Sequence, residues 1–200
     1  MRQMRLKNEC GIFLAGRKYC VLLAALVLSA CASAPPAEIP PRPVRESILH
    51  FELAGRAIIR QGARADSMRM TWEHSPDEDA MGFSSSLGMV VAELQRNATG
   101  ARWITADGER YEARSADQLL ARITDQPVPI ESLARWVLGR VNRNVPATRD
   151  SMGRLLEAVE EGWTVRILSY ESERPEALPS SIEVEHGPLR IRLAIEEWAV

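Results

Sequence analysis

The chain has 200 residues and a formal net charge of −2, which suits one domain with a sizeable core and argues against nucleic acid as a partner. Its lysines are confined to Lys7 and Lys18. A P-loop and Schiff-base chemistry both need a lysine, so neither kind of site is expected in the rest of the chain. The sequence therefore predicts no use of nucleotide energy.

The first 30 residues have the pattern of a bacterial secretory signal. An apolar run, VLLAALVLSAC, follows a cationic start that contains Arg2, Arg5, Lys7, Arg17 and Lys18. The run is shorter than the about 20 apolar residues that a membrane-spanning helix needs. We therefore predict that residues 1–30 are a signal peptide that is removed, whether translation starts at Met1 or at Met4.

The apolar run ends in Leu28-Ser29-Ala30-Cys31, the spacing of a lipobox. Such signals are cut before the cysteine, which becomes the acylated first residue. We therefore predict that Cys31 carries an N-acyl and an S-diacylglycerol group. Ala32 stands where an aspartate would retain a lipoprotein in the inner membrane, so the predicted location is the periplasmic face of the outer membrane. An ordinary signal with a chance cysteine is the alternative.

Two of the three cysteines, Cys10 and Cys20, lie in the predicted signal, and lipid would consume the third, so no intramolecular disulfide is expected. A segment with five prolines, ASAPPAEIPPRPVRES, follows Cys31. Such a composition favours an extended, semi-rigid tether. The predicted organisation is a signal over residues 1–30, a tether over 31–47 and one domain over 48–200.

Alternation of apolar and polar residues dominates the predicted domain. A period of two predicts half-buried strands of an antiparallel sheet at residues 50–61, 66–74, 88–97 and 101–106. Asp107-Gly108 predicts a hairpin turn after the last of these. Residues 181–200 read as a second hairpin, with Leu189, Ile191, Leu193 and Ile195 on one face.

Two helices are predicted in the middle of the chain. Ser115 and Gln118 form a capping box before residues 119–123. Pro129 then precedes a second helix that ends at Gly139. One apolar stripe of this helix contains Ile130, Leu133, Trp136 and Val137. Residues 153–160 are compatible with a helix or a strand. The expected fold is a mainly β, curved antiparallel sheet whose concave face is covered by the helices.

No catalytic or metal-binding arrangement emerges from the sequence, so neither an enzyme nor a cofactor is predicted. The segment GFSSSLG has Ser86 where a Gly-x-Ser-x-Gly elbow needs glycine. The three histidines lack the spacing of metal ligands. The acidic segment EHSPDEDA, residues 73–80, could hold a cation, but acidic residues between two strands more often form a solvated turn.

The chain resembles the LolB family of outer-membrane lipoprotein receptors from about Leu49 to Trp198. The order and spacing of many short motifs carry this resemblance. They are Leu53-Ala54-Gly55-Arg56, Trp72, Leu87-Gly88, Tyr111-Glu112-Ala113, Leu119-Leu120, Pro127-Val128-Pro129, Leu133, Trp136, Leu138-Gly139, Gly162-Trp163, Val165, Leu178-Pro179, Arg190-Ile191-Arg192-Leu193 and Trp198. The family fold is an unclosed antiparallel half-barrel with a helical lid over an apolar cavity, and it implies a strand from Arg154 to Val159.

The resemblance implies that the chain accepts lipoproteins from a LolA-type periplasmic carrier and inserts them into the outer membrane without nucleotide hydrolysis. The expected partners are that carrier, the acyl chains of lipoproteins and the bilayer, with the receptor itself a monomer. The residues expected to line an acyl-chain cavity are Met68, Met70, Trp72, Leu133, Trp136, Val137, Ile191 and Leu193. An outer-membrane lipoprotein that only binds a protein or envelope component is the alternative.

The resemblance also implies a membrane-insertion loop at Leu87 and Gly88. The family typically has Asn-Pro-Leu-Gly where this chain has Ser85-Ser86-Leu87-Gly88. The leucine is present, but the proline that would stiffen the approach to it is replaced by Ser86. The sequence alone therefore leaves open how this loop is held.

Overall fold

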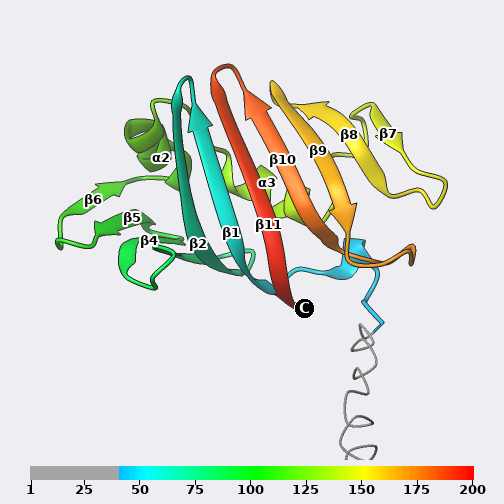
Figure 1. Cartoon of the computed structure of the whole chain (residues 1–200), viewed down its shortest axis with the longest axis horizontal. Helices are drawn as coiled ribbons and strands as arrows, with labels where there is room; N and C mark the ends of the chain where they lie inside the picture. Colours follow the sequence, from blue (N-terminus) through cyan, green and yellow to red (C-terminus); the bar gives the residue numbers. More distant parts are fainter. Residues whose placement is uncertain (1–40) are drawn as a thin grey trace, which may run out of the picture. The chain divides into compact units, whose positions relative to one another are not determined.

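The computed structural model describes residues 41–200, so the predicted signal, the lipid attachment at Cys31 and most of the tether lie outside the described residues. The described chain forms one antiparallel sheet of eleven strands (Figure 1). Its order is β6-β5-β4-β3-β2-β1-β11-β10-β9-β8-β7. The outermost strands do not pair with each other, so the sheet is unclosed, as expected.

The strands run in nearly regular sequence from the centre of the sheet to its two edges. They are β1 (Phe51–Gln61), β2 (Arg64–His74), β3 (Asp79–Ser84), β4 (Val90–Asn97), β5 (Gly100–Thr105), β6 (Arg110–Ala113), β7 (Ala147–Arg149), β8 (Leu155–Glu160), β9 (Trp163–Tyr170), β10 (Pro179–His186) and β11 (Leu189–Ala199). The first and last strands pair side by side at the centre of the sheet.

The alternation of the sequence divides the sheet into an inner and an outer face. On β1, Phe51, Leu53 and Ala57 are buried, whereas Glu52 and Arg56 are exposed. The pairing of β1 with β2 keeps this register along both strands. The predicted strands at residues 50–61, 66–74, 88–97, 101–106 and 181–200 are confirmed.

Both predicted helices lie on the same side of the sheet, behind it in the view of Figure 1. Helix α2 (Ala116–Thr124) begins at Ser115, whose hydroxyl accepts a hydrogen bond from the Gln118 N–H at 3.2 Å. Helix α3 (Ile130–Val137) begins after Pro129. Gly139 follows it with φ +71°, a conformation that favours glycine, and so ends the helix as predicted. No helix of residues 41–200 is long and apolar enough to cross a membrane.

Two segments depart from the simple patterns in the sequence. Residues 155–160, which were compatible with helix or strand, form β8, as the family fold implied. The sequence did not predict strand β3, because DAMGFS contains glycine and begins inside the acidic segment 73–80. The solvated turn predicted for that segment is wrong for Asp79, which begins β3 and is only 2% exposed.

The folded part of the chain begins before β1. A 3₁₀ turn, η2 (Arg45–Ser47), precedes the buried Ile48. Before it, Arg42 forms an ion pair with Glu171 at 2.7 Å, and the Arg45 guanidinium donates to the Ala177 carbonyl at 2.9 Å. The last residues of the predicted tether therefore pack against the domain.

Candidate functional site

A cavity of about 490 Å³ lies between the inner face of the sheet and the two helices. Its volume is within the usual range of about 300–1,000 Å³ for small-molecule sites. The lining is mostly apolar. Its buried apolar members are Ala57, Met70, Trp72, Met81, Ala92, Leu94, Leu120, Val128, Ile130, Leu133, Ile191 and Leu193. Ile59, Met68, Phe83, Val91, Trp103 and Ile123 line it while partly or largely exposed to solvent.

Most of the residues expected at a cavity lie in this lining. They are Met68, Met70, Trp72, Leu133, Ile191 and Leu193. Strand β2 supplies the first three, because its alternation places them on one face. Strand β11 supplies Ile191 and Leu193 in the same way. Helix α3 supplies Leu133 from the side opposite the sheet.

Trp136 and Val137 do not line the cavity, which corrects the expectation for both. Each is completely buried. The Trp136 indole N–H donates to a carboxylate oxygen of Glu160 at 2.6 Å, and its ring centroid lies 6.0 Å from that of Trp163. The cavity reaches only the first part of α3, around Ile130 and Leu133. Farther along the helix, the same stripe meets β8 and β9, where side chains fill the space.

The sequence did not indicate several lining residues. Met81 and Phe83 belong to β3, the strand that was missed. Leu120 and Ile123 come from α2, for which only the capping box was recognised. Ala92 and Leu94 share the inner face of β4, and the alternation of that strand was the signal that could have identified them.

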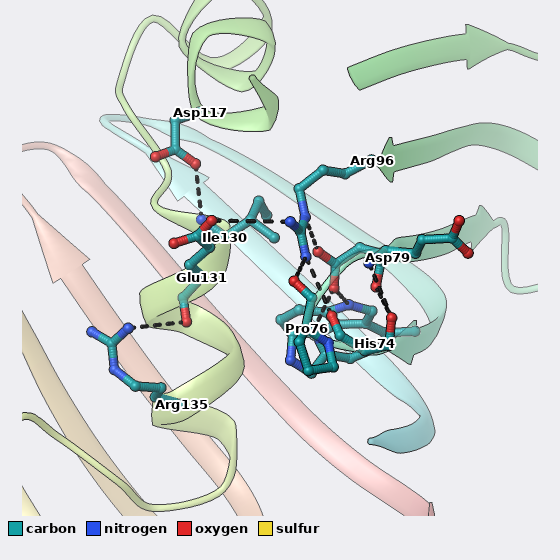
Figure 2. A network of polar contacts seen from close by, with 11 residues as sticks. His74, Pro76, Asp79, Arg96, Asp117, Ile130, Glu131 and Arg135 are labelled. Atoms are coloured by element: carbon teal, nitrogen blue, oxygen red, sulfur yellow. Dashed lines mark hydrogen bonds and ion pairs between the residues drawn. The ribbon is translucent and has the colours of Figure 1, made fainter. Parts of the chain in front are cut away.

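A buried carboxylate, Asp79, lies beside Trp72 of the cavity wall and is hydrogen-bonded to it. It accepts hydrogen bonds from the Trp72 indole N–H at 2.8 Å and from His74 Nδ1 at 2.6 Å, while Arg96 binds its second oxygen (Figure 2). Burial by itself would raise the pKa of Asp79. The hydrogen bonds from His74, Trp72 and Arg96, with the charge of His74, outweigh burial and lower this pKa below its ordinary value.

Arg96 extends this network to the helices. Its guanidinium donates to the carbonyls of Ser75 and Pro76 and lies 3.9 Å from the Glu131 carboxylate, in the first turn of α3 (Figure 2). In that same turn, the Ile130 N–H donates to Asp117 of α2 at 3.0 Å. One set of polar contacts therefore joins Trp72, in the cavity wall, to the start of α3.

The pKa of Asp117 is shifted in the opposite direction from that of Asp79. Burial is the largest cause of its raised pKa, and the nearby charges of Glu131 and Glu161 raise it further. The hydrogen bond from the Ile130 N–H and the charge of Arg96 oppose this shift without cancelling it. Asp117 thus caps α3 at an electrostatic cost.

The loop between β3 and β4 projects an apolar tip. Leu87 is 85% exposed, and Met89 and Val90 beside it are also exposed. Gly88 has φ +82°, which an L side chain rarely adopts. Ser85 closes the loop: its N–H donates to the Met89 carbonyl at 2.8 Å, and its hydroxyl accepts from the Met89 N–H at 3.2 Å. These bonds close the loop, which contains no proline.

No cluster of three or more His, Cys, Asp or Glu side chains within residues 41–200 is arranged to hold a metal ion. Asp79, the buried acid of the segment 73–80, is instead occupied by the three side-chain donors described above.

Comparison with known proteins identifies the family of the chain. A family model described as outer membrane lipoprotein LolB matches residues 49–198. The chain belongs to the LolB family. A LolB-family relative, the outer-membrane lipoprotein LolB of Azoarcus sp. (strain BH72), is 35% identical over 177 residues, covering 88% of this chain and 91% of that protein. The LolB of Dechloromonas aromatica (strain RCB) is 33% identical, covering 90% and 96% respectively.

Among solved structures, a DUF1329 family protein from Desulfovibrio piger superposes with a TM-score of 0.47 at 8% identity, covering 77% of this chain and 86% of that chain. A match this distant carries no conclusion about function. The LolB match, in contrast, spans both helices and all eleven strands of the described fold except the last residue of β11.

Proposed function

We propose that this LolB-family chain is an outer-membrane receptor that accepts lipoproteins from a LolA-type periplasmic carrier and passes them into the bilayer. The observation that carries the proposal is the apolar cavity of about 490 Å³. It lies between the sheet and the two helices, and it is lined by pliable side chains such as Met68, Met70 and Met81. Methionine adapts readily to irregular chains.

Hydrocarbon burial supplies the affinity in this proposal. Each methylene of an acyl chain that leaves water gains about 0.8 kcal/mol, so even a partly buried chain is held firmly. The same gain is available in a bilayer, so the cavity holds cargo without making its release into lipid unfavourable. Transfer then follows a gradient of affinities from carrier to receptor to membrane, and a ligand shifts each step only by its differential binding free energy.

The exposed loop around Leu87 is the proposed contact with the membrane. A leucine that is 85% exposed at the tip of a hydrogen-bonded loop has no packing role in the domain. Insertion of Leu87 and Met89 into the interface would bring the cavity rim to the lipid surface, because Ser85 and Val91, on either side of the loop, both line the cavity. We further propose that Cys31 anchors the receptor to the same membrane.

A transfer assay with Leu87→Glu tests the loop. Carrier loaded with an acylated lipoprotein is mixed with receptor and vesicles, and the cargo in each fraction is counted with time. The variant should accept cargo from the carrier at the normal rate but release it to vesicles at least about tenfold more slowly, because insertion would bury a charge. Normal release by this variant would remove the loop from the mechanism.

Leu168→Glu is the matched control. Leu168 is also an exposed leucine, 43% accessible, but it lies on β9, far from β3 and β4 in the strand order. Its replacement should leave both acceptance and release unchanged. A Cys31→Ala chain, exported to the periplasm, tests the anchor: it should be found in the soluble fraction, and recovery with the outer membrane would contradict the anchor.

A further inference from the structure

The inner face of β2 changes its chemistry from one end to the other. At one end Trp72 is completely buried and Met70 is 6% exposed. Met68 follows and is partly buried. The next two side chains on this face, Asp66 and Arg64, are charged and solvent-accessible, and they also line the cavity. From Arg64 to Trp72 an extended strand covers about 26 Å.

The polar lining of the cavity is concentrated at the end with Arg64. The Arg64 Nε atom donates to Asp66 at 2.8 Å. Across the hairpin, Gln61 pairs with Arg64 in register, and its side-chain amide donates to the Thr124 carbonyl, at the end of α2, at 2.9 Å. We call Gln61, Arg64, Asp66 and Thr124 the polar rim.

Immediately around Trp72, the described side chains offer no free hydrogen-bond donor, and the nearest other indole N–H in the lining is that of Trp103, three strands away on β5. The indole N–H of Trp72 is already bound to Asp79. Its neighbours in the lining there, Met70, Met81 and Leu94, carry no polar hydrogen. An ester or amide carbonyl placed in this region would lose its water without gaining a partner, which costs on the order of 1–3 kcal/mol for each group.

We infer that the polar rim binds the polar end of an acylated cargo and so fixes the direction in which its chains enter. The carbonyl oxygens of the acyl esters and amide accept from Arg64 and Gln61, and backbone N–H groups of the first cargo residues donate to Asp66. The methyl ends of the chains lie toward Trp72. This inference rests on the proposed function and adds an orientation and a set of positioning residues to it.

Contact quenching of tryptophan by bromine tests the orientation. Two of the five tryptophans, Trp72 and Trp103, line the cavity, so a Trp103→Phe receptor leaves Trp72 as the reporter. The hydrophobic core of the domain lies entirely within the compact unit from Ile39 to Val200. A secreted chain that starts at Ile39 therefore serves for the measurement. The probes are two diacylglyceryl-cysteine dipeptides, brominated either near the methyl ends of the chains or beside the ester carbonyls.

The methyl-end probe should quench Trp72 several-fold more than the ester-end probe at equal saturation. Equal quenching, or stronger quenching by the ester-end probe, would overturn the orientation while leaving acyl-chain binding intact. Failure of both probes to bind would overturn the orientation and the proposed function together. Titration of the unsubstituted receptor with each probe gives the saturation independently of Trp103→Phe.

A matched pair of variants tests the rim by binding affinity as well as by quenching of Trp72. Arg64→Gln should weaken binding of the unbrominated lipopeptide about threefold to tenfold, the usual range for one hydrogen bond of modest net strength. It should also reduce the excess of Trp72 quenching by the methyl-end probe over quenching by the ester-end probe. Arg60→Gln, in the same hairpin but on the outer face, should leave affinity and preference unchanged. Equal effects of the two substitutions would overturn the role of Arg64.

Discussion

Two buried tryptophans show how the two halves of this domain differ. One half, under β1–β5, contains the cavity, and the other, under β8 and β9, is filled by side chains. Trp72 and Trp136 are both completely buried, and each donates its indole N–H to a buried carboxylate, Asp79 or Glu160. Yet Trp72 lines the cavity under β1–β5, whereas Trp136 packs against Trp163 where α3 crosses β8 and β9. Burial and hydrogen bonding therefore do not distinguish a cavity wall from a filled core. The difference lies in what faces the ring.

The filled half also ties α3 to the sheet. Glu160 accepts from Arg135 at 3.3 Å as well as from Trp136. Toward the cavity, the start of α3 has the long Arg96–Glu131 ion pair and the cap from Asp117. Polar contacts therefore hold both ends of α3, and those to the buried Glu160 lie at the end away from the cavity.

The largest expected effect is that of Trp136→Ala. It should lower the free energy of unfolding by about 4 kcal/mol, since removal of a packed tryptophan typically costs about 3–5 kcal/mol. Trp72→Ala should cost about 1 kcal/mol less, because the other side chains of the cavity lining have room to move into the space that the ring leaves. Urea unfolding followed by circular dichroism measures both. An equal or larger loss at Trp72 would contradict the distinction between the two halves.

Asp79→Asn should have the next largest effect. It should lower the free energy of unfolding by about 3 kcal/mol, because it leaves the partners of a buried ion pair uncompensated. The lowered pKa of Asp79 also sets a pH dependence. Its contribution to stability is complete above the unfolded value of 3.8 and is lost as pH falls through the lower folded value. Unfolding midpoints measured between about pH 7 and about pH 3 should therefore fall more steeply for the unsubstituted protein than for Asp79→Asn. Parallel curves would argue against an ionised Asp79.

Substitutions that add volume should also distinguish the cavity from the filled core, with smaller changes in stability. Ala57 lies in the cavity lining, whereas Ala134, on α3, is buried outside it. Ala57→Phe should change stability by less than about 1 kcal/mol but weaken acyl-lipopeptide binding at least about tenfold, because the ring occupies the cavity. Ala134→Phe should cost about 2 kcal/mol with binding unchanged in the folded protein. Calorimetric titration and urea unfolding check the pair, and the reverse pattern would place the cavity elsewhere.

The sequence predicted the faces of the sheet well and the cavity only in part. Alternation placed Met70, Trp72 and Leu193 on the inner face, because the side chains of a strand necessarily alternate. The helical stripe placed Leu133 and Trp136 together, and both do face the sheet. Which of the two meets empty space depends on residues of distant strands, and no local pattern contains that information.

The polar network was harder to predict for a similar reason. The burial of Asp79 depends on Arg96, which lies 17 positions along the chain, on another strand. In the sequence Asp79 is one of several acids in a segment with turn-forming residues, so a solvated turn was the natural prediction. The loop at Leu87 was predicted from family resemblance. Its closure by Ser85 depends on a backbone geometry that composition does not reveal.

The smallest expected effect belongs to Asp117→Asn, and its sign is opposite to that of Asp79→Asn. Because the pKa of Asp117 is raised, the ionised carboxylate makes folding less favourable than the neutral one. This penalty is absent below the unfolded value of 3.8 and grows as pH rises through the higher folded value. In Asp117→Asn the amide oxygen still accepts the Ile130 N–H, and the loss of the charge removes the repulsion by Glu131 and Glu161.

Asp117→Asn should thus stabilise the protein by a few tenths of a kcal/mol at neutral pH, about the size of a surface electrostatic effect. Urea midpoints at neutral and acid pH measure it. A clear destabilisation at neutral pH would mean that the charge of Asp117 at the start of α3 outweighs its burial, and that α3 is held on the cavity side more tightly than its contacts indicate.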